Sequence, residues 1–164
     1  MGIPLLVLIL LVGVFDLFHI RPKFIPGDRV WAQAEKEGER SGLEPAFIYA
    51  ICVAESSLNA HARAGRARGL MQMTPVAWKE VEAGSFGGAF SWRRNMRAGV
   101  DYLLFCRELL PEPYRNSYAH LAASYRYGPY KVRAAAGDLS QLPRPKNLIY
   151  QELFAGDLQP ELLP

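Results

Sequence analysis

The chain has 164 residues, of which 50% are hydrophobic and 21% are charged, and its formal net charge is +3 at pH 7. That length suits one domain with its own core, and the sequence contains no internal repeat or low-complexity tract that would indicate a repeat or fibrous protein. The modest charge makes the basic residues more typical of a solvated surface than of a nucleic-acid site, so no nucleic-acid partner is expected.

An apolar run opens the chain, from residue 3 to residue 15, and it differs from everything that follows. Its length matches the core of a signal peptide and falls short of the ~20 residues that span a bilayer comfortably. Asp16 and His19 interrupt the run, but a membrane anchor stays open if the apolar residues at 17, 18 and 20 are included. We therefore predict that residues 1–20 are a signal peptide or a membrane anchor, with membrane association through residues 3–20 in the second case.

The rest of the chain is predicted to be helical, with short connections and no strand alternation. Glycine, serine and proline mark the breaks, which include a plain glycine-rich loop over residues 84–88 and a loose tail over residues 157–164. These signals predict an all-α fold, as a single compact helical domain. The expected helices span residues 28–40, 45–55, 75–81, 94–110, 114–125, 129–136 and 146–155.

Glu55 is the most informative residue, because helical spacing places it on an apolar face that begins near Pro45. Burying an unpaired carboxylate costs several kcal/mol, so such a group finds a partner or takes up a proton. A carboxyl that is protonated near neutral pH can act as a general acid. Periodicity alone leaves open that Glu55 turns outward or pairs with an arginine. The apolar residues on its face are Phe47, Ile48, Ile51 and Cys52.

The segment after Glu55 is predicted to be a loop that returns towards it. Residues 56–68 are small and polar, with little apolar periodicity. Thr74 then suits an N-cap and Pro75 the first position of the next helix. The candidate acid therefore lies at a helix end and faces the Gly-Leu-Met-Gln segment at residues 69–72.

Five motifs follow one another in a fixed order along the chain. They are Glu55-Ser56, Gly69-Leu70-Met71-Gln72-Met73-Thr74-Pro75, Asn95-Met96-Arg97-Ala98-Gly99-Val100-Asp101-Tyr102-Leu103, Ala123-Ser124-Tyr125-Arg126-Tyr127-Gly128-Pro129, and Leu142-Pro143-Arg144-Pro145 with Tyr150. Together they resemble the lytic transglycosylase family of the SLT (goose-type lysozyme-like) class. The resemblance covers about residues 28–156, and it implies a lysozyme-like, SLT-type catalytic domain there.

The resemblance implies a peptidoglycan lytic transglycosylase. Such an enzyme cleaves the β-1,4 bond between N-acetylmuramic acid (MurNAc) and N-acetylglucosamine (GlcNAc) without water and leaves a 1,6-anhydroMurNAc end. Glu55 would be the catalytic residue, first as acid and then as base. The substrate-binding residues that the resemblance implies are Ser56, Met71, Gln72, Tyr125 and Tyr150.

Several of these residues also have a structural interpretation. Gln72 could satisfy backbone groups of the return loop, and Tyr125 and Tyr150 could be core aromatics with a hydroxyl at the edge. Packing is the favoured role for the side chains of Met71 and Met73.

The chain departs from the family pattern beside the expected cleft. The loop between Glu55 and Gly69 is one residue shorter than usual, and Ala64 or a neighbour replaces a serine often found in its middle. Arg126 takes the place of the usual asparagine, and residues 146–147 read Lys-Asn where Glu-Thr is common. We expect these changes to alter glycan or stem-peptide preference and to leave the acid in place.

Glu55 has no obvious second carboxylate, although ordinary glycosidases place two across the scissile bond. Asp101 lies within the long helix and Glu108 near its end. One acid suffices if the acetamido oxygen of the substrate stabilises the anomeric centre and its own C6 hydroxyl attacks. A hydrolytic muramidase or chitinase on the same scaffold, and a non-catalytic envelope glycan-binding protein, remain open as alternatives.

The expected partners and ligands follow from these predictions. Peptidoglycan glycan strands are the expected partner, envelope or secretion machinery is a further candidate, and the expected location is the periplasm or cell envelope, at the inner membrane if the chain is anchored. The three histidines lack ligand-like spacing with cysteines or acids, so no metal is expected, and no cofactor is implied. Cys52 and Cys106 fall on buried helical faces, and we favour two buried thiols over a disulfide.

Overall fold

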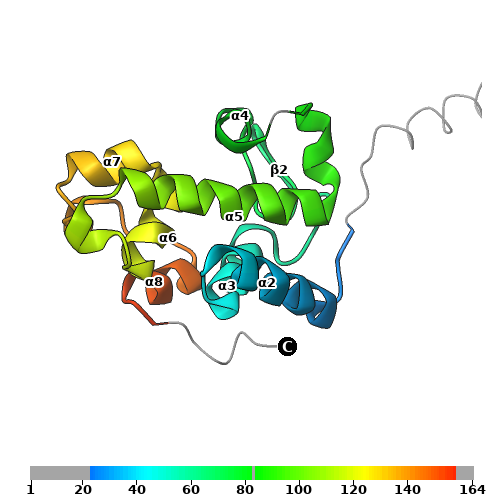
Figure 1. Ribbon diagram of the computed structural model, residues 1–164, viewed down its shortest axis with the longest axis horizontal. Helices are drawn as coiled ribbons and strands as arrows, with labels where there is room; N and C mark the ends of the chain where they lie inside the picture. The colour runs from blue at the N-terminus through cyan, green and yellow to red at the C-terminus, as the bar shows by residue number, and fades with distance from the viewer. Residues whose placement is uncertain (1–22, 83, 158–164) are drawn as a thin grey trace, which may run out of the picture.

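The computed structural model describes residues 23–82 and 84–157, which are mostly helical (Figure 1). Its helices and strands are α2 (Gly27–Ser41), α3 (Pro45–Ser56), β1 (Arg63–Ala64), β2 (Ala67–Arg68), α4 (Pro75–Val81), η1 (Phe86–Phe90), α5 (Trp92–Leu109), η2 (Glu112–Tyr114), α6 (Tyr118–Tyr127), α7 (Pro129–Ala134), η3 (Leu139–Gln141) and α8 (Leu148–Phe154), where η marks 3-10 helices.

The long helix α5 crosses the middle of the molecule (Figure 1). In that view α2 and α3 lie on one side of it, and α4 with the strands lies on the other. The short helices α6, α7 and α8 gather near its C-terminal end. Contacts join α5 to α2, α4, α6 and α7, and they join α3 to α2 and α8. The chain therefore brings the end of α3 next to α8, which is separated from it by most of the sequence.

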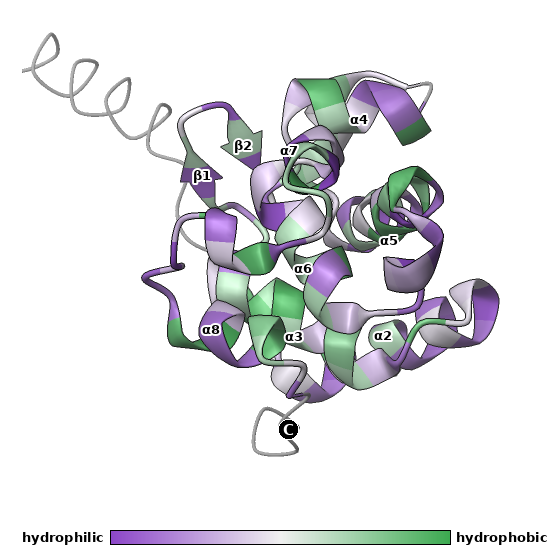
Figure 2. Ribbon diagram, turned by 90° about the vertical axis from the view of Figure 1, so that its left-hand side faces the viewer, coloured by the Kyte–Doolittle hydropathy of each residue, from purple (hydrophilic) through white to green (hydrophobic). Residues whose placement is uncertain are grey.

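Helix α3 forms the centre of the hydrophobic core. Its residues from Phe47 to Cys52 are all buried, so the helix is covered on nearly every side. Pro45 occupies its first turn, where a fixed φ and a missing N–H cost nothing. Figure 2 shows hydrophobic colour along much of α3. Such a helix can hold a side chain at its end with little freedom to move.

A second, smaller cluster packs α4 and η1 against α5. Trp78 is its largest member and is 1% exposed. The indole N–H of Trp78 donates to the carbonyl of Gly84 at 3.0 Å, which ties the end of α4 to the segment before η1. The segment between β2 and α4, residues 69–74, runs between the two clusters. The other members of the smaller cluster are Met73, Ala77, Ala89 and Ala98.

The predicted helices are confirmed, with shifts at their ends. The largest shift is at α6, which begins at Tyr118 because residues 112–114 form the separate 3-10 turn η2. Helix α8 begins at Leu148 because the side chain of Asn147 caps it. The thiols of Cys52 and Cys106 are free and buried, as predicted.

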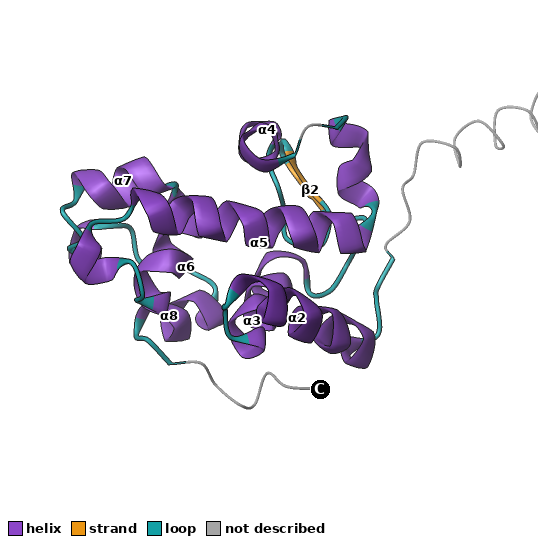
Figure 3. Cartoon of the chain, in the orientation of Figure 1, coloured by secondary structure: helices purple, strands orange, loops and turns teal. Residues whose placement is uncertain are grey.

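Two loop predictions were wrong in detail. Arg63–Ala64 pairs with Ala67–Arg68 as a two-residue antiparallel hairpin, although no strand was expected. Gly65 at the turn has φ +57°, a value that glycine adopts without strain. Two residues per strand are too few to give an alternation signal. The glycine-rich segment expected to be a plain loop is 3-10 helical from Phe86 to Phe90 (Figure 3).

The apolar run at residues 1–20 and the tail at 158–164 lie outside the described residues. Within residues 23–82 and 84–157, no helix has the length and apolar character needed to cross a bilayer.

Candidate active site

Glu55 lies in the last turn of α3, where that helix meets α8. Its side chain is only 10% exposed, which excludes the outward-facing alternative. The hydroxyl of Tyr150 donates to Glu55 Oε1 at 2.5 Å, across a separation of 95 residues. Tyr150 is itself fully buried in α8, so the packing around its ring holds the hydroxyl in place. The predicted acid and one predicted partner are thus brought into direct contact.

Burial raises the pKa of Glu55 above its ordinary value, because the ionised carboxylate loses hydration. The hydrogen bond from Tyr150 and the charge of Arg126 lower that pKa, but they oppose the larger effect of desolvation. Arg126 Nη1 is 3.7 Å from Glu55 Oε1, which is an ion-pair distance too long for a hydrogen bond. A carboxyl with a raised pKa keeps its proton to higher pH, as a general acid requires.

Asn147 sets the position of Tyr150 relative to Glu55. Its Oδ1 accepts from the backbone N–H of Tyr150 at 3.2 Å and caps α8. Its Nδ2 donates to the carbonyl of Ala54 at 3.3 Å, one residue before Glu55. One side chain therefore joins the start of α8 to the end of α3. The sequence showed Asn147 only as a departure from the family pattern, and nothing in it indicated this bridge.

Tyr125 and Ser56 hold the return loop rather than the acid. The Tyr125 hydroxyl donates to the carbonyl of Met71 at 2.7 Å and lies 3.4 Å from Met73 Sδ. The Ser56 hydroxyl donates to the carbonyl of Leu70 at 2.7 Å. Both residues thus fix the loop beside the end of α3. The substrate contacts predicted for Tyr125 and Ser56 stay predictions.

Gln72 and Met71 lie in the same loop with different surroundings. Gln72 is 9% exposed, has φ +49°, and donates from Nε2 to the carbonyl of Gly69 at 2.9 Å. It also lines a hollow, so both the structural and the substrate interpretation of Gln72 remain compatible with its position. Met71 is fully buried, and its side chain packs against Gly99 of α5. The Met71 side chain thus has the packing role that the sequence favoured, and the substrate contact predicted for Met71 stays a prediction.

Asn95 anchors the return loop from the side of α5. It is fully buried, and its Oδ1 accepts from the N–H of Met71 at 2.7 Å. Its Nδ2 donates to the carbonyls of Arg68 at 3.0 Å and Ala89 at 2.8 Å. Sequence reasoning placed Asn95 in a motif but gave it no role. The available signal was an amide on the otherwise apolar, buried face of a helix.

A hollow of about 210 Å³ opens beside the return loop and α6. Arg126 belongs both to this hollow and to the surroundings of Glu55, so the two are joined through one side chain. The residues that line the hollow are Gln72, Met73, Thr74, Ala77, Tyr102, Tyr125, Arg126 and Gly128.

Comparison with known proteins identifies the family. The model of the transglycosylase SLT domain matches residues 32–144. The chain belongs to the transglycosylase SLT domain family. This confirms the resemblance drawn from the five motifs. No curated protein sequence matches the chain.

The fold of this SLT domain is also found in a solved structure. The crystal structure of an inactive Glu-to-Gln mutant of the lytic transglycosylase Slt from Pseudomonas aeruginosa matches it with a TM-score of 0.55 and 23% sequence identity. The match covers 80% of this chain and 21% of the Slt chain. The SLT domain described here thus spans about a fifth of that protein's length, and the likeness shows a shared fold.

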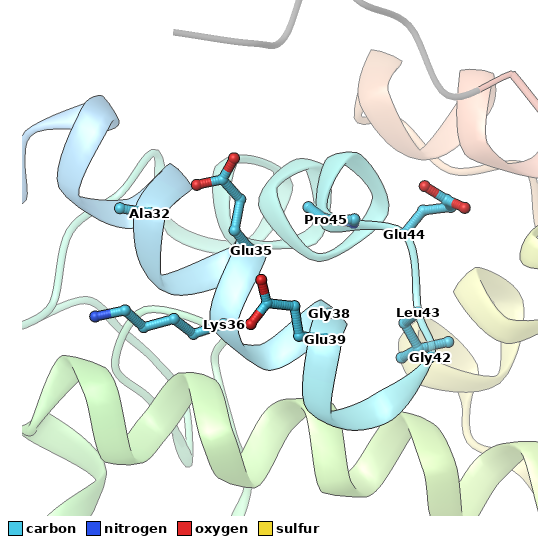
Figure 4. A pocket seen from close by; sticks show the side chains of 9 residues that line it. All are labelled: Ala32, Glu35, Lys36, Gly38, Glu39, Gly42, Leu43, Glu44 and Pro45. Atoms are coloured by element: carbon cyan, nitrogen blue, oxygen red, sulfur yellow. The ribbon is translucent and has the colours of Figure 1, made fainter.

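A larger hollow, of about 750 Å³, lies away from Glu55 at the turn between α2 and α3 (Figure 4). Pro45 lines it, and at 1.5 Å per residue Pro45 is about 15 Å along α3 from Glu55. Figure 4 shows the side chains of Glu35 and Lys36 pointing in different directions. In the part of the chain that the structure describes, no three His, Cys, Asp or Glu side chains gather as a metal site would require.

Proposed function

We propose that this SLT domain is a peptidoglycan lytic transglycosylase that cleaves the MurNAc–GlcNAc β-1,4 bond and leaves a 1,6-anhydroMurNAc end. The observation that carries the proposal is the pair formed by Glu55 and Tyr150. A sheltered carboxyl with a raised pKa is held by a buried hydroxyl at 2.5 Å, which is the arrangement of a positioned general acid. Membership of the SLT family supports the choice of substrate.

The site supports a mechanism with one carboxylate. Among the described residues, the charge that shifts the pKa of Glu55 is that of Arg126, and no carboxylate contributes to the shift. Asp101, one candidate for a second acid, is engaged by Arg40 at 2.6 Å. Glu108, the other candidate, is exposed on α5. A retaining or inverting glycosidase would need a second carboxylate across the scissile bond.

The proposed reaction conserves its protons within the site. Glu55 donates a proton to the glycosidic oxygen as the bond from that oxygen to C1 of MurNAc breaks. The acetamido oxygen of MurNAc stabilises the positive charge that develops at C1. The C6 hydroxyl oxygen then bonds to C1, and its proton returns to the Glu55 carboxylate. The acid is regenerated, the product is a 1,6-anhydro ring, and no water is consumed.

The neighbouring residues have supporting roles in this proposal. Tyr150 holds the carboxyl in one orientation, which lowers the entropy cost of reaching a reactive geometry. Gln72 at the edge of the hollow would hydrogen-bond the sugars, and Tyr125 and Ser56 would keep the loop that carries it in place. These substrate contacts are the part of the proposal that a complex with a glycan fragment would test directly.

The proposal includes export, because peptidoglycan lies outside the cytoplasm. Residues 1–20 would direct export, either as a signal peptide that is removed or as an anchor that is kept. Mass measurement of the full chain recovered from membrane and soluble fractions distinguishes the two forms. Recovery of the intact chain only in the cytoplasm would contradict this part of the proposal.

Digestion of purified murein sacculi tests the activity. Products ending in 1,6-anhydroMurNAc are lighter by one water than products with a reducing end, so mass spectrometry separates the two reactions. We expect anhydro products. Reducing ends would instead support a hydrolytic muramidase, and binding without products would support a non-catalytic glycan-binding protein.

A further inference from the structure

Arg126 is the one charged group that approaches Glu55 among the described residues. It lies in the last turn of α6, and its side chain is 44% exposed. Its guanidinium lies 5.3 Å from the ring centroid of Tyr150, so the tyrosine that holds the acid also carries the cation on its face. Its distance of 3.7 Å from Glu55 is that of an ion pair without a hydrogen bond, so the carboxyl of Glu55 does not accept from the guanidinium.

The hollow beside Arg126 is otherwise neutral. It is bounded by the return loop, α4, α5 and α6, and Arg126 is the only charged residue among the eight that line it. Hydrogen-bonding groups from Gln72, Thr74 and Tyr102 share its wall. A small concave site with one partly exposed cation and several neutral polar groups is complementary to an anionic group of the ligand.

In the proposed reaction, the positive charge of Arg126 has no negative partner among the described residues when the substrate binds. Glu55 must be protonated to act as an acid, and a protonated carboxyl no longer neutralises Arg126. A cation beside the acid also repels the positive charge that develops at the anomeric centre. An anion supplied by the substrate would remove both problems, because it would pair with the guanidinium.

We propose that Arg126 binds a carboxylate of the glycan substrate in this hollow, and that the domain therefore selects strands with negative charge beside the scissile bond. The inference rests on the proposed function and makes it more specific. Arg126 would be a specificity-determining residue, which acts on the choice of strand and leaves the bond-breaking step to Glu55.

Two parts of peptidoglycan carry such a carboxylate. The lactyl group of MurNAc has a free carboxylate when its stem peptide has been removed. The stem peptide, where present, carries carboxylates of its own. Both would pair with the guanidinium in the same way, so the experiment has to distinguish them by using substrates that carry only one kind of carboxylate.

The experiment measures kcat/KM on two pairs of substrates. The first pair is peptide-free strands with free lactyl carboxylates and the same strands with those carboxylates converted to methylamides. The second pair is peptide-bearing strands, intact and after the same conversion. Each pair is cleaved by the wild type, Arg126→Asn, Arg126→Lys and Arg133→Asn. Arg133 is an exposed arginine on α7, so its variant makes the same charge change outside the hollow.

We expect the wild type to prefer the charged member of one pair by about tenfold, the effect of one charge-assisted hydrogen-bonded contact at a part-exposed site. The preference should be lost in Arg126→Asn, be partly kept in Arg126→Lys, and be unchanged in Arg133→Asn. The pair that shows it identifies the lactyl or the peptide carboxylate. A ratio within one enzyme is independent of any change in the acidity of Glu55, since both substrates meet the same acid.

Equal rates on charged and neutralised strands, or a preference that survives in Arg126→Asn, would overturn the inference. If the wild type cleaves none of the four substrates, the proposed function itself fails. Equilibrium binding of the same strands then decides the carboxylate site separately, because tighter binding of charged strands that depends on Arg126 supports it, and equal binding rejects it.

Discussion

Gly69 and Asn95 approach each other so closely that residue 69 has no room for a side chain. A Cβ on Gly69 would lie 2.4 Å from Asn95 Nδ2 and 2.2 Å from the carbonyl oxygen of Ala89. The φ of Gly69 is +81°, in the left-handed region. Asn95 and the backbone of Ala89 thus form a seat into which the start of the return loop fits, and this seat sets the position of the loop relative to α5.

The variant Gly69→Ala should therefore displace the return loop from Asn95 and Ala89. The clash involves backbone and a fully bonded amide, which cannot move aside as a flexible side-chain end could. We expect a loss of at least about 3 kcal/mol in the free energy of unfolding, together with a large loss of activity. Urea denaturation and glycan cleavage measure the two effects.

Gly65 offers a matched control, because it also has a positive φ, +57°, but a Cβ there would meet nothing within 4 Å. Gly65→Ala should cost only the backbone strain, about 1 kcal/mol. Equal losses for the two variants would show that strain alone, and not the seat, accounts for the effect at Gly69.

Removing the amide of Asn95 should loosen the same loop without a clash. Asn95→Ala leaves the N–H of Met71 and the buried carbonyl of Ala89 without these partners, and it removes one of two partners of the Arg68 carbonyl, which also accepts from the N–H of Met73. We expect a destabilisation of about 3 kcal/mol, since each unpaired buried group carries its own desolvation cost. Hydrogen exchange at the amide of Met71 should accelerate more than exchange in α3. Asn116→Ala, at an exposed turn, should change neither quantity, and a protected Met71 amide in Asn95→Ala would contradict the anchoring role.

Asn147 makes two bonds that substitution can separate. Asn147→Ala loses the cap of α8 and the bond to the carbonyl of Ala54, and the lost cap should lower stability by about 1 kcal/mol. Asn147→Thr keeps an acceptor for the cap but has no amide for the second bond, so we expect restored stability with reduced kcat. Thermal unfolding and kcat measured on both variants separate the two bonds. Full activity of Asn147→Thr would show that the cap alone places Tyr150.

Burial of Glu55 should make stability depend on pH in a definite direction. Its folded-state pKa lies above the ordinary 4.5, so between those two values the folded state binds more protons than the unfolded state. The contribution of this group is then fully present below pH 4.5 and is lost as the pH rises through the folded-state pKa. Glu55→Gln lacks this loss. Its stability advantage over the wild type, measured by denaturation across pH, should grow as the pH rises, and an advantage that shrinks would contradict the assignment.

The sequence was informative where the physical signal is local. The apolar stripe that ends in Glu55, the cap at Thr74 and the proline at the first turn of α3 are short-range patterns, and each predicted its element correctly. The five motifs then indicated that distant segments belong to one site. Glu55 and Tyr150 were both predicted as site residues for this reason.

What could not be predicted depends on how the distant segments pack. The bond from Asn147 to Ala54 joins residues 93 positions apart, and no pattern in either segment specifies it. The burial of Met71 follows from the missing side chain at Gly99, one helix away. The hairpin at residues 63–68 is too short to show a strand period. In each case the deciding contact is between side chains and backbone that only the folded chain brings together.

The most direct test of the account compares Glu55→Gln with the wild type in one digest of murein sacculi. Glu44→Gln, an exposed glutamate at the opposite end of α3, is the matched control. The account predicts anhydro-ended products from the wild type and from Glu44→Gln, and a loss of about 1,000-fold or more in their rate of release by Glu55→Gln, which stays folded. Undiminished release by folded Glu55→Gln would contradict the claim that this carboxyl is the proton donor.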